Sequence, residues 1–391
     1  MKSVKDLDVT SKRVFVRVDY NVPVDDNLNI TDDNRIKASL DLIYYLLEQN
    51  AKIIIASHMG RPNGKRDLKF SLAPVCERLS QLLKKRVLFA DDCVGDNVKK
   101  MVGQLDDGQI LMLENLRFHD GEKKNDDRFS KELAGLCDVY VNNAFAVSHR
   151  DQASVTGIPR FAPESAAGFL LEKEVRSYYD SVENPEKPLV AIIGGAKVSS
   201  KLAALENMLK FVDKLIIGGA MANTFLKSQG IDTQGSMIEE ALLQTASGIV
   251  KKAKEKKVDF MLPLDLVCAE KFDKDARVKE VLADQIPDQW MALDIGPKTA
   301  LKYARAIADA KTIVWNGPMG VFEMEKFMEG TRVVAKAIAA SSAFSIVGGG
   351  DTGLAAKKCN VAGKVSYVST GGGAFLHLME GRKLPGVVAL E

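Results

Sequence analysis

Residues 191–205, AIIGGAKVSSKLAAL, run from a short apolar stretch into two glycines and then into a helix that is predicted to begin near Val198. The apolar stretch has no polar position, which is typical of a parallel strand buried on both faces. Lys197 and Lys201 flank the helix start. Because free amide N–H groups and the helix dipole both favour negative charge, the stretch predicts a strand–turn–helix unit with an anion site at its turn.

Apolar runs of the same kind recur in both halves of the chain, with longer amphipathic stretches between them. In the first half they are VFVRV (14–18), KIIIA (52–56), VLF (87–89), ILML (110–113) and DVYV (138–141). In the second half they are PLVAIIG (188–194), DKLIIG (213–218), VDFML (258–262), TIVW (312–315), SIVGGG (345–350) and VSYVS (365–369). The spacing fits βαβ units and predicts an α/β fold of two doubly wound, Rossmann-like parallel-sheet domains.

The length of 391 residues is too great for one ordinary core and suits two domains. Helical periodicity extends from Phe169 to about Val182, and a polar segment with two prolines follows at 183–188. We therefore expect the two domains to be joined by a hinge helix.

Composition excludes several classes of protein. A net charge of +2 favours neither a nucleic-acid nor a membrane-surface partner, and no apolar run approaches the ~20 residues that span a bilayer. Five scattered cysteines form neither a disulfide framework nor a paired metal motif. The N-terminus lacks the apolar stretch of a signal peptide, so we expect a cytoplasmic protein.

Two further glycine-rich corners follow strands of the second half, in SIVGGGDTGLAAKK and VSYVSTGGGAFLHLMEG. Ligands of open α/β sheets bind at such corners. Asp351 supplies the hard oxygen that a phosphate-bridging Mg²⁺ requires, although it also suits a helix N-cap, and both roles can hold together. Glycines at strand-to-helix turns are often only steric, yet three such corners with two lysines and an aspartate favour a phosphate-and-metal site.

The segment GGGDTG matches G-x-G-x-x-G, so a nicotinamide dehydrogenase is an alternative. That motif requires an acidic residue about 20 positions further on, and the corresponding stretch VSYVSTGGG has none. The P-loop pattern is also absent. Residues 312–323, TIVWNGPMGVFE, are predicted to form a strand followed by a rigid loop. The loop is either a tight turn without further function or one wall of a purine and ribose site, in which Glu323 would accept from ribose hydroxyls.

Strand ends of the first half carry mainly arginine and histidine. His119 and His377 lack such a placement and are predicted to be surface residues. Each arginine alone could be a solvated charge, but their recurrence at predicted sheet tops favours a bound polyanion, because the guanidinium fork suits phosphate and carboxylate. The strand-end and helix-start residues concerned are Asp19, Asn21, Arg35, His58, Arg61, Arg117, His149 and Arg150.

An anion site on one domain and a nucleotide-phosphate site on the other suit phosphoryl transfer, which needs alignment, charge neutralisation and exclusion of water. The sequence has no Ser-His-Asp arrangement and no cysteine beside a paired base, so we expect no covalent enzyme intermediate. Domains that close on their substrates would sequester the reacting phosphate.

The motifs RVDYNVP, SHMGRP, LENLRFHDGE, AVSHRDQAS, GGAKVSSK, WNGPMGVFE, GGGDT and STGGGA together closely resemble the phosphoglycerate kinase family, in order from about Val14 to Leu384. The resemblance implies a monomer in which residues 1–170 bind 3-phosphoglycerate or 1,3-bisphosphoglycerate. Residues 171–373 would bind ADP or ATP with Mg²⁺, and residues 374–391 would return to pack on the first domain.

The resemblance also implies roles for matching residues. The acid-and-phosphate site would comprise Asp19, Asn21, Arg35, His58, Arg61, Arg117 and Arg150. Catalysis would rest on Arg35, Lys201 and the backbone of Gly372 and Gly373. The nucleotide contacts would be Lys197, Lys201, Gly218, Gly219, Ala292, Asn316, Pro318, Glu323, Gly349, Gly350, Asp351 and Thr352, with Asp351 as the metal ligand.

Two positions depart from the family pattern, which usually has Gly at Ala292 and Glu at His377. The added methyl of Ala292 would crowd or tighten the adenine pocket. A nucleotide-binding regulator without catalysis is a further alternative, but such a protein would be expected to lose a catalytic cation, whereas Arg35 and Lys201 are both present.

Overall fold

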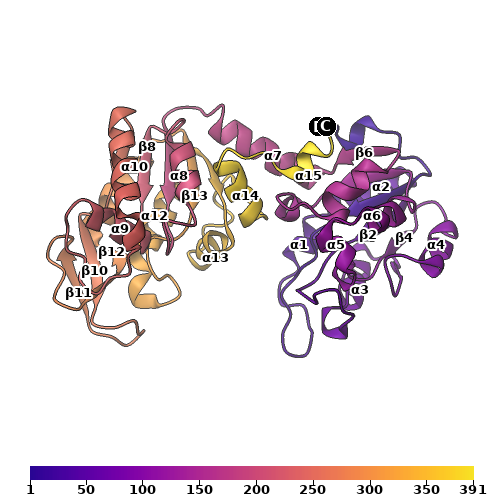
Figure 1. The fold of residues 1–391 in the computed structure, drawn as a ribbon, viewed down its shortest axis with the longest axis horizontal. Helices are drawn as coiled ribbons and strands as arrows, with labels where there is room; N and C mark the ends of the chain where they lie inside the picture. The colour runs from indigo at the N-terminus through magenta and orange to yellow at the C-terminus, as the bar shows by residue number, and fades with distance from the viewer. The chain divides into compact units, whose positions relative to one another are not determined.

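The computed structural model describes residues 1–391 and divides into two compact units, Met1–Val175 with Lys383–Glu391, and Arg176–Arg382 (Figure 1). Each unit contains a six-stranded parallel sheet with helices around it. The predicted α/β class with two parallel sheets is confirmed. None of the helices combines the length and apolar character needed to cross a membrane.

The sheet of the first unit has the strand order β3-β4-β2-β1-β5-β6 and is parallel throughout. Five of its strands coincide with the predicted apolar runs. The edge strand β6 was missed because its sequence, ESAA, is small and polar. The bounds are β1 (Arg13–Arg17), β2 (Lys52–Ala56), β3 (Leu88–Phe89), β4 (Ile110–Met112), β5 (Val139–Asn142) and β6 (Glu164–Ala167).

Helices and short turns complete the first unit, and Val14 and Val16 of β1 share one buried core with Leu42 of α2 and Leu79 of α3. The α-helices are α1 (Asn34–Lys37), α2 (Leu40–Glu48), α3 (Ala73–Leu83), α4 (Asp96–Gly103), α5 (Asp120–Lys124), α6 (Asp127–Ala134) and α15 (Pro385–Val388). The shorter turns are η1 (Val4–Asp6), η2 (Leu68–Phe70), η3 (Leu116–Phe118), η4 (Phe145–Val147), η5 (Ala153–Gly157) and η6 (Ile158–Arg160).

The parallel sheet of the second unit has the order β15-β14-β13-β7-β8-β9 and consists of the six runs predicted for that half. Its bounds are β7 (Leu189–Ile193), β8 (Lys214–Ile217), β9 (Asp259–Met261), β13 (Thr312–Asn316), β14 (Phe344–Val347) and β15 (Tyr367–Val368). Its helices are α8 (Leu202–Met208), α9 (Met221–Ser228), α10 (Leu243–Glu255), α11 (Pro297–Ala308), α12 (Glu329–Ala340), α13 (Gly350–Lys358) and α14 (Gly372–Met379), with η7 (Glu240–Leu242) and η8 (Glu325–Phe327).

A small antiparallel sheet, β11-β10-β12, was not predicted. Its strands are β10 (Asp265–Ala269), β11 (Val278–Leu282) and β12 (Met291–Ile295). β11 is largely exposed and mixes valines with charged residues, so it lacks the continuous apolar run that marks a buried strand.

Helix α7 (Phe169–Val182) has the predicted bounds, and the division between the units falls within it, after Val175 rather than at 170. The returning C-terminal segment begins at Lys383, later than the expected residue 374. Helix α14 stays with the second unit because the Tyr178 hydroxyl donates to Leu378 O at 2.5 Å and Asn207 Nδ2 donates to Met379 O at 2.9 Å.

The turn after β7 depends on glycine. A Cβ on Gly194 would overlap the carbonyl oxygen of Pro318, whereas a Cβ on Gly248, inside α10, would meet nothing within 4 Å. We expect Gly194→Ala to lower the free energy of unfolding by about 1–3 kcal/mol through overpacking. Gly248→Ala should raise it by about 0.5–1 kcal/mol, because alanine is the better helix former. Calorimetric melting of both variants checks this, and an unchanged Tm for Gly194→Ala would contradict it.

Candidate functional site

The carboxyl edge of the first sheet gathers the predicted acid-site residues. Asp19 and Asn21 follow β1, His58 and Arg61 follow β2, Arg117 lies in η3 after β4, and Arg150 follows η4 after β5. The strands β4, β2, β1 and β5 are neighbours in the sheet, and parallel strands present their carboxyl ends at one edge. Topology thus brings together side chains that lie up to 131 positions apart in the chain, from Asp19 to Arg150.

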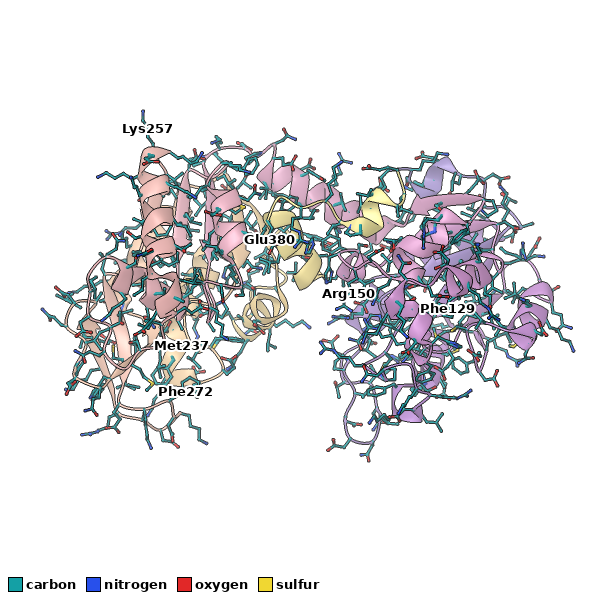
Figure 2. All side chains as sticks on the ribbon, viewed as in Figure 1. Phe129, Arg150, Met237, Lys257, Phe272 and Glu380 are labelled. Atoms are coloured by element: carbon teal, nitrogen blue, oxygen red, sulfur yellow. The ribbon has the colours of Figure 1, made fainter.

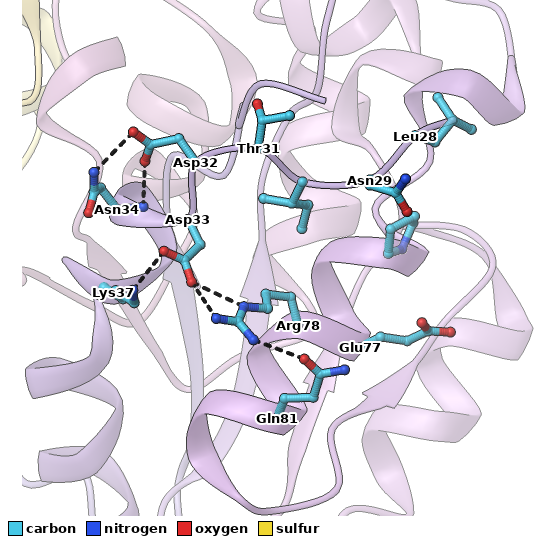
Figure 3. A pocket seen from close by; sticks show the side chains of 12 residues that line it. Leu28, Asn29, Thr31, Asp32, Asp33, Asn34, Lys37, Glu77, Arg78 and Gln81 are labelled. Carbon is cyan, nitrogen blue, oxygen red and sulfur yellow. Dashed lines mark hydrogen bonds and ion pairs between the residues drawn. The ribbon is translucent and has the colours of Figure 1, made fainter. Parts of the chain in front are cut away.

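Arg35 is held by an ion pair across this edge, since its Nη1 lies 2.7 Å from Asp19 Oδ2. It sits on the four-residue helix α1, whose start is anchored by Asp33. The Asp33 carboxylate accepts from Arg78 Nη2 of α3 at 2.7 Å and pairs with Lys37 at 2.8 Å (Figure 3). Asp33, Lys37 and Arg78 line a polar pocket of about 650 Å³ and pair with one another there, so we assign that pocket the role of positioning α1.

Arg117 is the most deeply buried arginine of the predicted acid set, at 6% exposure. Its Nη1 donates to Gly60 O at 2.8 Å, but its buried Nε has no hydrogen-bond partner. Burial and the nearby Arg150 and Arg17 lower the Arg117 pKa to about 10. A buried guanidinium with one N–H left without an acceptor is unfavourable on its own, and it therefore indicates an anion-binding site.

The other members of this site vary in exposure. Burial, ahead of the nearby charges, also lowers the pKa of Arg150, which is labelled in Figure 2. Asn21 Oδ1 accepts from Gly60 N at 2.8 Å and so fixes the turn after β2. Arg61 is exposed. His58 is buried, and desolvation together with the surrounding arginines places its pKa well below the usual range.

The carboxyl edge of the second sheet is made mainly of backbone. Gly219 (φ +68°) donates its N–H to Met319 O at 2.8 Å, and a Cβ there would overlap the backbone of Gly195. A Cβ on Gly372 would lie 3.1 Å from Gly349 Cα and from Gly350 N. These contacts bring the loops after β7 and β8 together, and likewise the loops after β14 and β15, along one surface at the carboxyl edge of the sheet.

Lys201 lies at the centre of this surface. Helix α8 begins at Leu202, not near Val198 as predicted, because Gly195 (φ +117°) opens a loop of turns and Lys201 occupies the N-cap position. Lys201 Nζ donates to both oxygens of Asn316, the carbonyl at 2.9 Å. Burial lowers the Lys201 pKa to about 8, and the Asp351 charge opposes that shift. Lys197 is exposed on the same loop.

Asn316 and Thr352 lock the loops around Lys201. Asn316 Nδ2 donates to Gly348 O at 2.8 Å, and the Thr352 hydroxyl accepts from Gly317 N at 2.7 Å. Asp351 lies in the first turn of α13 and is exposed. Its carboxylate is therefore available beside the glycine corners, as a metal ligand must be.

An apolar pocket of about 520 Å³ adjoins the glycine corners. Ala292 and Pro318 line it as predicted, together with Gly219, and Glu323 and Asp351 supply carboxylates to the same pocket. Met237 and Phe272, labelled in Figure 2, also line it and were not predicted. They are 48% and 61% exposed, which is unusual for large apolar side chains, but the sequence shows only isolated apolar residues in loops there.

A separate cluster of Asp92, Cys93 and His119 has ligand atoms within 4.8 Å of one another. His119, expected at the surface, is instead partly buried, stacks on Phe129 and lies 2.7 Å from Asp92 through Nε2. Burial raises the pKa of the Cys93 thiol well above its usual range, so the thiol stays protonated. These groups satisfy one another, and the metal prediction remains with Asp351.

The comparisons agree with this geometry. A family model described as phosphoglycerate kinase matches residues 4–382. The chain is 62% identical over 391 residues, covering both proteins fully, to the phosphoglycerate kinase of Desulforapulum autotrophicum. It is 56% identical, over 100% of this chain and 99% of the other, to that of Desulfosudis oleivorans.

Solved structures give the same result. The phosphoglycerate kinase of Coxiella burnetii has a TM-score of 0.92 at 44% identity, covering 99% of this chain and 98% of that chain. The one from Pyrococcus horikoshii has a TM-score of 0.82 at 33% identity, covering 100% and 98%.

The partly buried position of Lys201 has a measurable consequence. We expect its amine to react with acetic anhydride with a midpoint near pH 8, since burial lowers its pKa to about 8. Between about pH 8 and pH 10.5, Lys201 is protonated in the unfolded chain but largely deprotonated in the folded one. Because the unfolded state binds more protons there, this group makes the free energy of unfolding rise with pH over that range. Peptide mass spectrometry across a pH series measures the midpoint, and a value near 10.5 would contradict the burial of the amine.

Proposed function

The chain belongs to the phosphoglycerate kinase family, and we propose that its two carboxyl-edge sites divide the reaction between them. The enzyme is a phosphotransferase, EC 2.7.2.3, that moves a phosphoryl group reversibly from 1,3-bisphosphoglycerate to ADP in glycolysis. The site on the first unit would bind the three-carbon acid and the site on the second the nucleotide. The buried Nε of Arg117, which has no hydrogen-bond partner, is the observation that supports this assignment, because a bound phosphate or carboxylate would supply the missing acceptor.

In the acid site, the arginine forks would bind the substrate phosphate and carboxylate bidentately. His58 and Asn21 would add neutral donors, and Asp19 would orient Arg35, to which it is already paired at 2.7 Å. The remaining cations of the set are Arg61, Arg117 and Arg150.

In the nucleotide site, the apolar pocket suits the faces of a purine, and Glu323 would accept from ribose hydroxyls. Gly218, Gly219 and Pro318 would form the backbone wall between base and phosphates. The phosphates would take N–H groups at the start of α13, from Gly349, Gly350 and Thr352, where the helix dipole favours an anion. Lys197 and Asn316 would border the same phosphates.

The transferring phosphoryl group would be neutralised by Arg35 and Lys201 and by the backbone N–H groups of Gly372 and Gly373. Such preorganised donors act where charge develops in the transition state. Asp351 would hold a Mg²⁺ ion that, when bound, neutralises nucleotide phosphate charge. Lys201 needs its proton for this role, and the negative charge of Asp351 favours the protonated form.

We further propose that the protein works as a cytoplasmic monomer without nucleic-acid or membrane partners. The net charge of +2 and the five unpaired, buried cysteines support this.

A coupled assay for ATP-dependent formation of 1,3-bisphosphoglycerate, with and without Mg²⁺, tests the proposed function. We expect Lys201→Ala to lower kcat by about 10²–10³-fold, the usual loss when one donor aimed at transition-state charge is removed. Affinity for 3-phosphoglycerate should stay nearly unchanged. Lys210→Ala, on an exposed lysine just after α8, is the matched control. Near-normal kcat in Lys201→Ala would rule out the catalytic role of this lysine.

The metal assignment predicts a selective effect. Asp351→Asn should weaken binding of the Mg²⁺–ADP complex more than binding of free ADP, because it removes a charged oxygen ligand. Calorimetric titration of ADP with and without Mg²⁺ measures the difference. Asp309→Asn, an exposed aspartate at the end of α11, is the control. If Asp351→Asn keeps the full Mg²⁺ dependence, the carboxylate is not the metal ligand.

Because the two sites are built on separate sheets, transfer between them predicts a closing motion on binding. 3-Phosphoglycerate and a non-hydrolysable ATP analogue together should compact the molecule more than either alone. Small-angle scattering of the free, singly loaded and doubly loaded protein measures this. An identical radius of gyration in all four states would exclude transfer by closure.

A further inference from the structure

Three fully buried polar side chains lie beneath the acid site of the first unit: Arg17, Glu122 and Ser154. Arg17 ends strand β1, Glu122 lies in α5 and Ser154 lies in η5. None belongs to the residues that we place in contact with substrate. Burying a charge is unfavourable unless it is paired and hydrogen-bonded, so the contacts of these three residues need an explanation.

The hydrogen bonds among them have only one possible direction. Both oxygens of Glu122 accept from Ser154, Oε2 from the backbone N–H at 2.9 Å and Oε1 from the hydroxyl at 2.6 Å. With its proton committed to Glu122, the Ser154 hydroxyl accepts from Arg17 Nε at 2.7 Å. The Arg17 guanidinium also lies 4.0 Å from Glu122 Oε1. The chain Arg17→Ser154→Glu122, together with the hydrogen bond from Arg17 Nη1 to Val18 O, therefore fixes the plane of the guanidinium.

That plane directs Arg17 Nη2 at His58 Nδ1, 3.3 Å away. Arginine has only donors and cannot be deprotonated, so Nδ1 must accept. The alternative partner, Asp19 Oδ1, is 3.9 Å from Nδ1, which is too far for a hydrogen bond. Nδ1 of the His58 ring is thus an acceptor, and the hydrogen of the neutral ring is on Nε2.

The surroundings also keep the ring neutral. Burial comes first, and Arg17, Arg117, Arg150 and Arg35 add positive charge around His58, so its pKa lies well below the usual range. Asp19 is the carboxylate that faces the ring, and its nearer partner is Arg35 at 2.7 Å. A neutral imidazole with one fixed N–H is a directed donor, whose strength does not vary with pH near neutrality.

We propose that Glu122 and Ser154 are positioning residues that, through Arg17, lock His58 in the Nε2–H tautomer as a donor to the acid substrate. The role of His58 as a donor to substrate rests on the proposed function of the acid site. The tautomer itself is a property of the protein without ligand, so the two can be tested separately.

The test uses full-length protein with ¹⁵N-labelled histidine, with the His58 signals assigned by loss in His58→Asn. In the ligand-free wild type at pH 7 we expect a pyridine-type shift at Nδ1 and a pyrrole-type shift at Nε2. Glu122→Gln removes the charge that orients Arg17, and Ser154→Ala removes the link while keeping the Arg17–Glu122 charge balance. Either variant should give mixed tautomers, and Ser154→Ala serves if Glu122→Gln does not fold.

Kinetics supply the second readout. Both variants should raise KM for 3-phosphoglycerate about tenfold, the usual weight of one hydrogen bond to a charged group, with kcat changed far less. Glu132→Gln, on the neighbouring helix α6, is the control and should alter neither readout. All spectra and rates are recorded below each variant's unfolding transition by circular dichroism, so loss of fold is not mistaken for loss of positioning.

Two outcomes would overturn the proposal: a protonated Nδ1 in the wild type, or wild-type tautomer and KM in both folded variants. If the wild type shows the expected tautomer but does not phosphorylate 3-phosphoglycerate, the proposed function fails, while the positioning of His58 by Glu122, Ser154 and Arg17 is still supported.

Discussion

Parallel strands place all their carboxyl ends at one edge of a sheet, and both candidate sites of this protein depend on that constraint. In the first unit it brings the loops after β4, β2, β1 and β5 together, and in the second the loops after β8, β7, β13, β14 and β15. Residues far apart in sequence therefore become neighbours without any long connection. The buried, apolar strands are what allow this, because they leave only the loops free to carry polar groups.

The two edges favour anions by different means. The first uses cationic side chains that are partly desolvated, and the lowered pKa of Arg117, to about 10, reflects the energetic cost of burying them together. The second uses backbone turns brought into contact by glycines such as Gly219 and Gly372, with one partly buried cation, Lys201. Side-chain forks suit a small, planar carboxylate and phosphate, whereas a backbone surface suits a chain of phosphates that lies along it.

Much of this could be predicted from sequence because it rests on local patterns. Eleven apolar runs coincide with strands, and helix α7 has the expected bounds. Of what was missed, β6 is small and polar and β11 mixes valines with charged residues, whereas β10 is buried and largely apolar and does carry the pattern. The start of α8 was placed early because the turns between Gly195 and Lys201 have helix-compatible residues. Met237, Phe272 and Glu122 join their sites only through tertiary packing, which periodicity cannot reveal.

The distribution of carboxylates in the first unit determines which of its arginines are paired and which are left to attract an incoming anion. Asp19 pairs with Arg35, and Glu122 lies against Arg17, so each of these arginines is held in place by an internal partner. Such pairing orders the guanidinium forks but lowers their attraction for a ligand, because part of their charge is already compensated. Arg117 and Arg150 have no carboxylate within ion-pairing distance, and burial lowers the pKa of both. Arg61, which is exposed, also lacks an ion-pair partner, so these three arginines are the cations of the site that no carboxylate pairs. The paired arginines serve orientation, which is the role that a reaction of aligned phosphates requires.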